Sequence, residues 1–231
     1  MFSAIILAAG GSTRMNGVNK QLAKIGDVPV FVMSALAFQH SDMISEIILA
    51  APTDDAERFE KMAHNFGVTK LKAVVHGGNT RAVSVRNALL QVSDSCSHIA
   101  IHDGARPLIT TEDINRVLSD AVKYDAAIAA SPATDTVKLA GENGFIIDTP
   151  PREKLYYAQT PQAFSKKLYL DCLAKLGTQA DALTDDSALI EKCGGYVRIT
   201  EITGCNMKIT RPDDLTAANA IYLNRKAVKK L

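Results

Sequence analysis

Short apolar runs alternate along the chain with segments of helical period, and this alternation limits what the chain can fold into. The runs are predicted to be strands over residues 4–9, 46–51, 71–75, 98–102 and 126–130. The segments between them are predicted to be helices over residues 30–39, 54–66, 80–92 and 110–124. Continuous apolar strands that alternate with helices form right-handed βαβ units. The sequence therefore predicts an α/β protein with a Rossmann-like, mostly parallel sheet covered on both sides by helices.

The alternation stops after Pro132. Two short apolar stretches, at 137–139 and 145–147, flank a polar turn with a glycine at each end, which predicts a β-hairpin. A hairpin inserted here would project from the sheet as a β-arm, at about residues 134–156. Helices at 165–176 and 185–193, a strand at 197–202 and a helix from Asp213 are predicted for the remainder. With 231 residues and no internal repeat, residues 1–231 are predicted to be a single domain that carries this arm.

Composition argues against several classes of protein. Lys and Arg total 26 against 25 Asp and Glu, so a net charge of +1 gives no general attraction for nucleic acid. The four cysteines lack metal-binding or CxxC spacing and indicate free thiols in a reducing compartment. No stretch approaches the roughly 18 apolar residues of a membrane span. We expect a cytoplasmic protein with neither a nucleic-acid nor a membrane partner, in which any anion site is built locally.

The first predicted strand leads into a loop of small residues and cations. Its candidate phosphate-binding residues are Ala8, Ala9, Gly10, Gly11, Ser12, Arg14 and Lys20. Small residues let backbone amides approach a phosphate, and the cations add positive charge. The GxxxxGK[ST] and GxGxxG patterns are both absent, which excludes a Walker loop and a dinucleotide fingerprint. A flexible glycine turn with two solvated cations is the alternative interpretation.

Two other polar segments carry candidate residues. Gly77, Gly78 and Ser84 follow the third predicted strand at the start of a helix, where they would suit an anion or the polar edge of a base. A plain helix cap explains them equally well. Lys208 alternates with apolar neighbours and is predicted to point off one face of a short strand.

The fourth predicted strand ends in a carboxylate. Asp103 stands at the strand terminus, and Arg106 follows it. An Asp beside a phosphate loop is well placed to hold Mg²⁺, with Arg106 orienting its carboxylate. The alternative is an Asp–Arg pair that only shapes a turn. His102 is expected to be a packed strand residue rather than a ligand.

Seven sequence blocks follow one another along nearly the whole chain: AAGGSTRM with Lys20-Gln21, GGNTRAVSV, HDGARP, DTVK, AQTPQ, TDDSA and KITRPDDL. In this order they resemble the blocks of the 2-C-methyl-D-erythritol 4-phosphate cytidylyltransferase family. The resemblance implies a nucleotidyltransferase of Rossmann-like fold that acts in the non-mevalonate isoprenoid pathway. It would transfer CMP from CTP to 2-C-methyl-D-erythritol 4-phosphate, giving CDP-methylerythritol and pyrophosphate, with Mg²⁺ or another divalent cation. It also implies a homodimer in which crossed β-arms complete each other's sites.

The resemblance also implies roles for individual residues. The catalytic cations would be Arg14, Lys20 and Lys208. The nucleotide would contact Ala8, Ala9, Gly10, Gly11, Ser12, Gly77, Gly78, Ser84 and Asp103, with Asp103 also holding the metal. The polyol phosphate would contact Arg106, Thr136, Arg152 and Thr160.

Two positions depart from the family pattern. Ser12 replaces a glycine, and Cys205 stands in an acidic position that helps to hold the metal. A neutral thiol is a poor Mg²⁺ ligand, so the second metal ligand stays open. Two alternative functions share this fold: a CTP:ribitol-5-phosphate cytidylyltransferase and a non-catalytic nucleotide-binding protein. Methylerythritol phosphate is preferred because HDGARP, AQTPQ and TDDSA look closer to that family.

Overall fold

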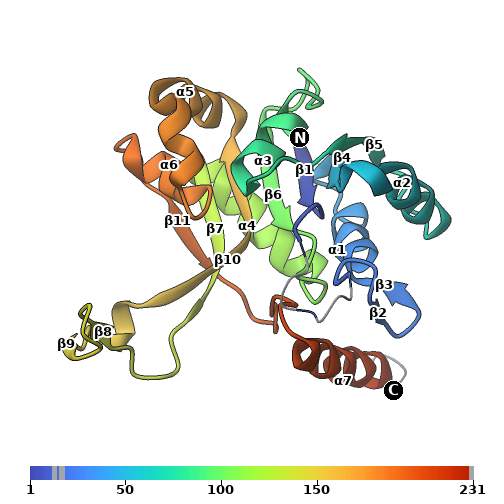
Figure 1. Ribbon diagram of the computed structural model, residues 1–231. Helices are drawn as coiled ribbons and strands as arrows, with labels where there is room; N and C mark the ends of the chain where they lie inside the picture. Colours follow the sequence, from blue (N-terminus) through green and yellow to red (C-terminus); the bar gives the residue numbers. More distant parts are fainter. Residues whose placement is uncertain (12–14, 16–18, 229–231) are drawn as a thin grey trace.

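A seven-stranded sheet forms the centre of the computed structural model, which describes residues 1–11, 15 and 19–228. Its strand order is β11-β7-β10-β6-β1-β4-β5 (Figure 1). The strands are β1 (Phe2–Leu7), β4 (Ile44–Ala51), β5 (Leu71–His76), β6 (His98–Asp103), β7 (Ala126–Pro132), β10 (Tyr156–Ser165) and β11 (Arg198–Glu201). All neighbours pair in parallel except β10, which runs antiparallel to both β6 and β7. The predicted α/β fold with a mostly parallel sheet is confirmed.

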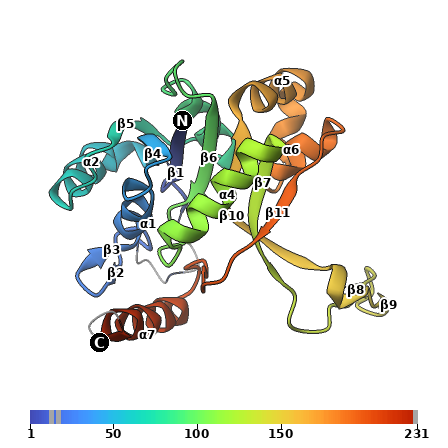
Figure 2. The same ribbon diagram turned by 180° about the vertical axis from the view of Figure 1, so that it is seen from behind.

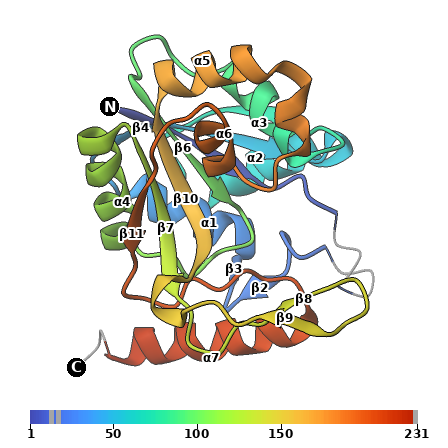
Figure 3. The same ribbon diagram turned by 90° about the vertical axis from the view of Figure 1, so that its left-hand side faces the viewer.

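Helices cover both faces of the sheet (Figures 2 and 3). One face carries α1 (Val30–Gln39), α2 (Ala56–Asn65) and α4 (Thr111–Tyr124), and the other carries α3 (Arg81–Leu89), α5 (Lys166–Leu176) and α6 (Ser187–Lys192). Side chains alternate across β1, so Phe2 packs with the first set and Ile5 with the second. Burial on both faces explains the continuous apolar runs of these strands.

The chain order creates a crevice next to β1. From β1 the chain moves outward through β4 to β5, and α3 then returns it to β6 on the other side of β1. Leu7 and Asp103, the last residues of β1 and β6, lie opposite each other. Open α/β sheets bind ligands at such a topological switch point, outside the carboxyl ends of the strands.

Strand β10 is the main element that the sequence did not predict. Its inner half, from Thr160 to Phe164, is buried between β6 and β7. The pairing with β7 shifts between Ala158 and Gln162, around a cis peptide bond between Thr160 and Pro161. Gln, Thr and Pro in succession favour a turn in sequence, because proline donates no ladder hydrogen bond. The shift in register accommodates the proline within an interior strand.

A separate hairpin lies away from the main sheet. Strands β8 (Leu139–Ala140) and β9 (Ile146–Asp148) pair only with each other, and Figures 1 and 2 show them standing off from the body. Gly144, with φ of 76°, occupies the turn between them. A 3₁₀ turn, Arg152–Lys154, follows before the chain enters β10. No helix within the described residues is long and apolar enough to cross a membrane.

The C-terminal helix packs against the segments that follow β1 and β6. Helix α7 (Pro212–Val228) packs on the small hairpin of β2 (Lys24–Ile25) and β3 (Val28–Pro29). The short strand predicted around Lys208 is wrong, because no strand forms between Asn206 and Thr210. This segment is held instead by the Ile209 N–H, which donates to the Ala105 carbonyl at 2.8 Å. The Asn206 side chain also donates to the Thr160 carbonyl at 2.8 Å, so hydrogen bonds on both sides of Lys208 hold the segment without a strand.

Candidate active site

A pocket of about 240 Å³ opens at the switch point, and we call it the switch-point pocket. It is lined by Leu7, Ala9, Gly10, Gly11, Lys20, Gln21, Gly78, Asn79, Thr80, Arg81, Ser84, Asp103, Ala105 and Lys208. The loops after β1, β5 and β6 therefore meet there with the segment before α7. Most of the residues predicted to bind the nucleotide come together in this pocket.

Glycines allow these loops to approach one another. A Cβ added at Gly77 would lie 2.0 Å from the Cβ of Ala9, which no packing can accept. Gly77 is also fixed by its N–H, which donates to the Ala51 carbonyl at 2.8 Å. Added Cβ atoms at Gly10 and Gly11 would meet no described residue within 4 Å. Gly77 thus permits a close backbone contact, whereas Gly10 and Gly11 leave room for a ligand.

The loop before α3 both caps the helix and lines the pocket. The Thr80 hydroxyl accepts from the Val83 N–H at 3.2 Å, which makes Thr80 the N-cap. The Ser84 hydroxyl accepts from the Gly78 N–H at 3.0 Å and donates to the Thr80 carbonyl. The two interpretations of this segment are therefore compatible. The hydroxyl of Ser84 fixes the glycine turn from beneath.

Asp103 is the acidic residue that lines the pocket, and cations surround it. Its carboxylate accepts from Lys208 Nζ at 2.8 Å and lies 3.5 Å from Arg81 Nε and 3.6 Å from Arg106 Nε. Burial opposes its ionisation, but the charges of Lys208 and Arg81 hold the pKa of Asp103 well below its usual range. Asp103 is therefore a carboxylate at every physiological pH.

Residues beneath Asp103 fix its position. The buried Thr160 hydroxyl accepts from the Asp103 N–H at 3.0 Å and contacts His102 Nδ1 at 3.1 Å. The other nitrogen of His102, Nε2, lies 3.2 Å from the Arg106 carbonyl and must donate to it. Burial lowers the pKa of His102 to about 4, so the ring is neutral and packed, as a strand residue was expected to be. Arg106 itself donates to the Asn206 carbonyl at 2.9 Å.

Some of the predicted residues are not among those that line the pocket. Ala8 is fully buried behind the pocket. Thr136 and Arg152 belong to the arm segment and do not line the pocket; Arg152 Nη1 donates to the Thr134 carbonyl at 2.9 Å. Ser12 and Arg14 are outside the described residues.

Arg81 and Gln21 line the pocket although neither had a predicted role. Arg81 bridges toward Asp103, and the Oε1 atom of Gln21 is buried in the pocket wall without a hydrogen-bond partner among the described residues. The signal for Arg81 was its position directly after a glycine turn, as the first residue of a helix. Gln21 stood beside Lys20, but nothing in its spacing indicated where its amide would lie.

Among the described residues, no cluster of three or more His, Cys, Asp or Glu side chains could hold a metal ion. Cys205, where the resemblance implies an acidic metal ligand, is exposed. Mg²⁺ is commonly held by one or two carboxylates together with substrate phosphates. An ionised Asp103 beside a cationic pocket fits that mode of binding.

Comparison with known proteins places the chain in a family. The model of the family "IspD: 2-C-methyl-D-erythritol 4-phosphate cytidylyltransferase" matches residues 2–224. The chain belongs to this family. The 2-C-methyl-D-erythritol 4-phosphate cytidylyltransferase of Caldanaerobacter subterraneus subsp. tengcongensis is 41% identical over 218 residues, covering 94% of this chain and 96% of the relative. The corresponding protein of Alkaliphilus oremlandii is 38% identical over 226 residues, or 97% of this chain and 96% of its own length.

Solved structures agree with that assignment. The 4-diphosphocytidyl-2C-methyl-D-erythritol synthase of Anaerococcus prevotii superposes with a TM-score of 0.85 at 30% identity, covering 96% of this chain and 98% of its own. The 2-C-methyl-D-erythritol 4-phosphate cytidylyltransferase of Thermus thermophilus gives a TM-score of 0.75 at 27% identity, covering 94% and 97%. These similarities extend over the sheet, the helices and the arm segment alike, since almost the whole of each chain is covered.

Proposed function

We propose that this protein transfers CMP from CTP to 2-C-methyl-D-erythritol 4-phosphate and releases pyrophosphate. Family membership supports the reaction, and one structural observation carries it. Three cations, Lys20, Arg81 and Lys208, line the switch-point pocket together with Asp103, and Arg81 and Lys208 contact its carboxylate. A site of this kind suits a polyanion such as a triphosphate, and it is built locally in a chain of nearly neutral charge.

The nucleotide would occupy the pocket in a defined direction. The turn at Gly77 and Gly78, held by Ser84, would meet the cytosine, and the open loop at Gly10 and Gly11 would meet the phosphates. Lys20, Lys208 and Arg14 would neutralise the charge that builds up on the α-phosphate and on the leaving pyrophosphate. Because Lys208 now donates to Asp103, its ammonium must turn toward the phosphates when the nucleotide binds.

The acceptor requires no protein base. A phosphate monoester has a second pKa of about 6 and is largely a dianion at neutral pH. Its oxygen can attack the α-phosphorus in line as the bond to pyrophosphate breaks. His102, the nearest imidazole to Asp103 in sequence, is buried and neutral, with both ring nitrogens already occupied. The protein would therefore act by bringing two anions together and stabilising the charge that develops.

Asp103 would hold the divalent cation, which we propose to be Mg²⁺. When bound, the ion would supply charge stabilisation between phosphate oxygens. Arg106, which contacts Asp103 and is anchored to the Asn206 carbonyl, would keep the carboxylate oriented.

The arm is proposed to complete the site of a second copy of the chain. Thr136 and Arg152 do not line the pocket of their own chain but match positions that contact the polyol phosphate. Four apolar side chains of the arm are also more than half exposed: Leu139, Phe145, Ile146 and Ile147. A cluster of this kind is typical of an interface. We therefore propose a cytoplasmic homodimer in which each arm covers the acceptor side of the partner's pocket, where Arg106 and the strand carrying Thr160 lie.

Complementation tests the crossed arms. Arg152→Ala and Lys208→Ala each damage one half of a composite site, so each variant alone should be nearly inactive. Co-expression should restore about a quarter of wild-type activity, because half of the dimers are mixed and each has one intact site. No recovery in the co-expressed sample would show that arm and pocket act within one chain.

The reaction itself is tested by pyrophosphate release. The assay compares 2-C-methyl-D-erythritol 4-phosphate, ribitol 5-phosphate and no acceptor, each with CTP and Mg²⁺. Release with the methylerythritol phosphate alone supports the proposal. Release with ribitol 5-phosphate alone, or CTP binding without release, would overturn it.

A further inference from the structure

A line of alternating charges runs from the switch-point pocket into the interior. Asp103 lies 3.5 Å from Arg81 Nε, and Arg81 Nη1 lies 2.6 Å from Asp186 Oδ2. The Tyr169 hydroxyl then donates to Asp186 Oδ1 at 2.7 Å. The line thus connects β6, the start of α3, the residue before α6 and helix α5.

The inner half of this line is buried and firmly held. Asp186 is 5% exposed and Tyr169 is 3% exposed, so the contact between them is shielded from water. Gln162 Oε1 accepts from the N–H groups of both Asp186 and Ser187, at 2.9 Å each. Breaking one member of a buried ion pair is costly because the other charge is left uncompensated. The position of Asp186 is therefore fixed by its contacts, and the ion pair with Asp186 holds Arg81.

Helix capping does not account for Asp186. The residue just before it, Asp185, accepts from the Ala188 N–H at 3.1 Å and so serves the first turn of α6. Asp186 makes no side-chain cap hydrogen bond, and its two oxygens face Arg81 and Tyr169. Its carboxylate is directed at the pocket wall.

We propose that Asp186, supported by Tyr169, is a positioning residue that holds the Arg81 guanidinium in the pocket wall beside Asp103. The kinetic part of this inference rests on the proposed function. With Asp186 in place, its carboxylate neutralises the charge of Arg81 on the side away from the pocket. Asp103 is then not required to neutralise Arg81 and can exchange Lys208 for substrate or metal. Without the Asp186 charge, Arg81 keeps only Asp103 as an anionic partner among its described contacts and gains attraction for the triphosphate.

The expected signature is a split between binding and turnover. In Asp186→Asn, the charge of Arg81 is no longer balanced by Asp186, so Arg81 binds CTP more strongly in the ground state. Its guanidinium also moves from its place beside Asp103, so Asp103 and the phosphates are no longer aligned for the reaction. Tighter ground-state binding does not accelerate the chemical step. We expect kcat to fall about tenfold while the Kd for CTP is unchanged or lower, a coupling within the usual range for contacting residues. A general loss of structure would instead weaken CTP binding along with kcat.

A double-mutant cycle tests whether Asp186 acts through Arg81. The Kd for CTP is measured by calorimetry in the presence of Mg²⁺, and kcat by pyrophosphate release, for wild type, Asp186→Asn, Arg81→Gln and the double variant. With Arg81 already neutral, Asp186→Asn should change Kd and kcat by no more than about twofold. Tyr169→Phe should act in the same direction as Asp186→Asn but less, and Asp186→Glu should restore part of kcat. Asp120→Asn on α4, outside the pocket, is the matched control.

The outcomes separate this inference from the proposed function. Additive effects of Asp186→Asn and Arg81→Gln, or a Kd for CTP that rises in step with the loss of kcat, would overturn the positioning role. If Asp186→Asn does not fold, Tyr169→Phe in both Arg81 backgrounds gives the same comparison. A wild type that binds CTP but releases no pyrophosphate would refute the proposed function, and the cycle in Kd would still decide the role of Asp186.

Discussion

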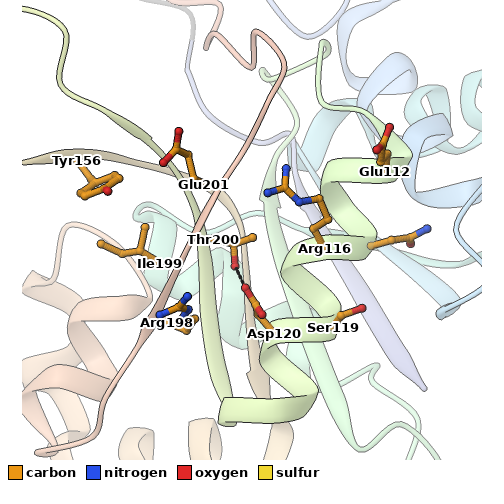
Figure 4. Close-up of a pocket in the computed structure, with 10 residues that line it drawn as sticks. Glu112, Arg116, Ser119, Asp120, Tyr156, Arg198, Ile199, Thr200 and Glu201 are labelled. Atoms are coloured by element: carbon orange, nitrogen blue, oxygen red, sulfur yellow. Dashed lines mark hydrogen bonds between the residues drawn. The ribbon is translucent and has the colours of Figure 1, made fainter.

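The switch-point pocket and a groove on the far edge of the sheet differ in size and in chemistry. The groove lies between α4 and β11, and at about 980 Å³ it is the larger of the two (Figure 4). Glu112, Arg116 and Asp120 of α4 face Arg198 and Glu201 of β11 across it. The pocket has only about 240 Å³. Size alone would place the function in the groove.

The polar contacts of the two regions favour the switch-point pocket over the groove. In the groove, the Thr200 hydroxyl donates to Asp120 at 2.6 Å, and Arg116 pairs at 3.4 Å with Asp113 of its own helix. Such contacts join neighbouring elements and are satisfied locally. In the pocket, Lys208 and Arg81 come from distant segments and converge on Asp103. A binding site is recognised by this convergence of charge within a crevice, and volume is a poorer guide.

Removal of a converging cation should give the largest contrast between the regions. Lys208→Ala is expected to lower kcat by roughly 10²–10³, the usual loss for one electrostatic contact to the transition state. Arg198→Ala in the groove removes a cation of the same charge and should leave kcat within about twofold, because surface substitutions away from the chemistry have little effect. Steady-state pyrophosphate release measures both. Equal losses in the two variants would remove the distinction between pocket and groove.

The buried His102 ring, which lies next to the pocket, should also make the free energy of unfolding depend on pH. The pKa of His102 is lowered to about 4 by burial, against an ordinary value of 6.5, so between these pH values the unfolded chain binds a proton that the folded protein excludes. Stability should therefore fall as pH drops from about 6.5 to about 4, by on the order of 3 kcal/mol. Asp103 acts at lower pH, because its depressed pKa stabilises the fold above its ordinary value of 3.8 and that contribution is lost below it.

Substitution of His102 isolates its share of the pH dependence. Urea unfolding of wild type and His102→Gln is compared at pH 7.5 and pH 5. The variant is less stable at neutral pH, since contacts to Thr160 and the Arg106 carbonyl change, but its stability should decline less on acidification. Parallel declines in the two proteins would show that the imidazole is not held neutral.

The close approach of two backbone segments, at Gly77 and Ala9, is a third feature that distinguishes the pocket from the groove. In Gly77→Ala the added methyl would overlap Ala9, so the loops after β1 and β5 must separate. Overpacking of this kind costs about 1–3 kcal/mol, and the KM for CTP should rise roughly tenfold. Gly10→Ala adds a methyl that would meet no described residue within 4 Å, and it should leave the free energy of unfolding unchanged or slightly raised. Chemical denaturation and CTP saturation curves measure these effects, and similar losses of stability in both variants would contradict the packing account.

The sequence predicted those parts of the fold that local pattern encodes. Buried strands such as β4 appear as unbroken apolar runs, and the glycine pairs and Asp103 follow strands at their carboxyl ends. Parallel topology then implies that these strand ends meet at one edge of the sheet, so the pocket could be located before its geometry was known. Helix α1 was predicted with the bounds that the structure gives.

Features that depend on distant contacts were not predicted. Strand β10 owes its place to pairing with β6 and β7, while Pro161 within it favours a turn in sequence. Asp186 reads as part of a helix cap, because nothing local reveals that Arg81 lies against it. The hydrogen bond that the Thr160 hydroxyl accepts from the Asp103 N–H was likewise not indicated by the sequence. In each case the partner lies tens of residues away and is brought near only by the sheet.

The smallest expected effect is in the groove, and it tests whether the groove, like the switch-point pocket, takes part in the reaction. Thr200→Val removes the hydroxyl that donates to Asp120 while keeping a similar side-chain volume. Loss of one such hydrogen bond should lower the free energy of unfolding by about 1 kcal/mol, and kcat should stay within about twofold of wild type. Urea unfolding and pyrophosphate release measure the two quantities on one preparation. A fall in kcat larger than the loss of stability explains would mean that the edge formed by α4 and β11 takes part in the reaction, and the groove would then have to be counted as part of the working site.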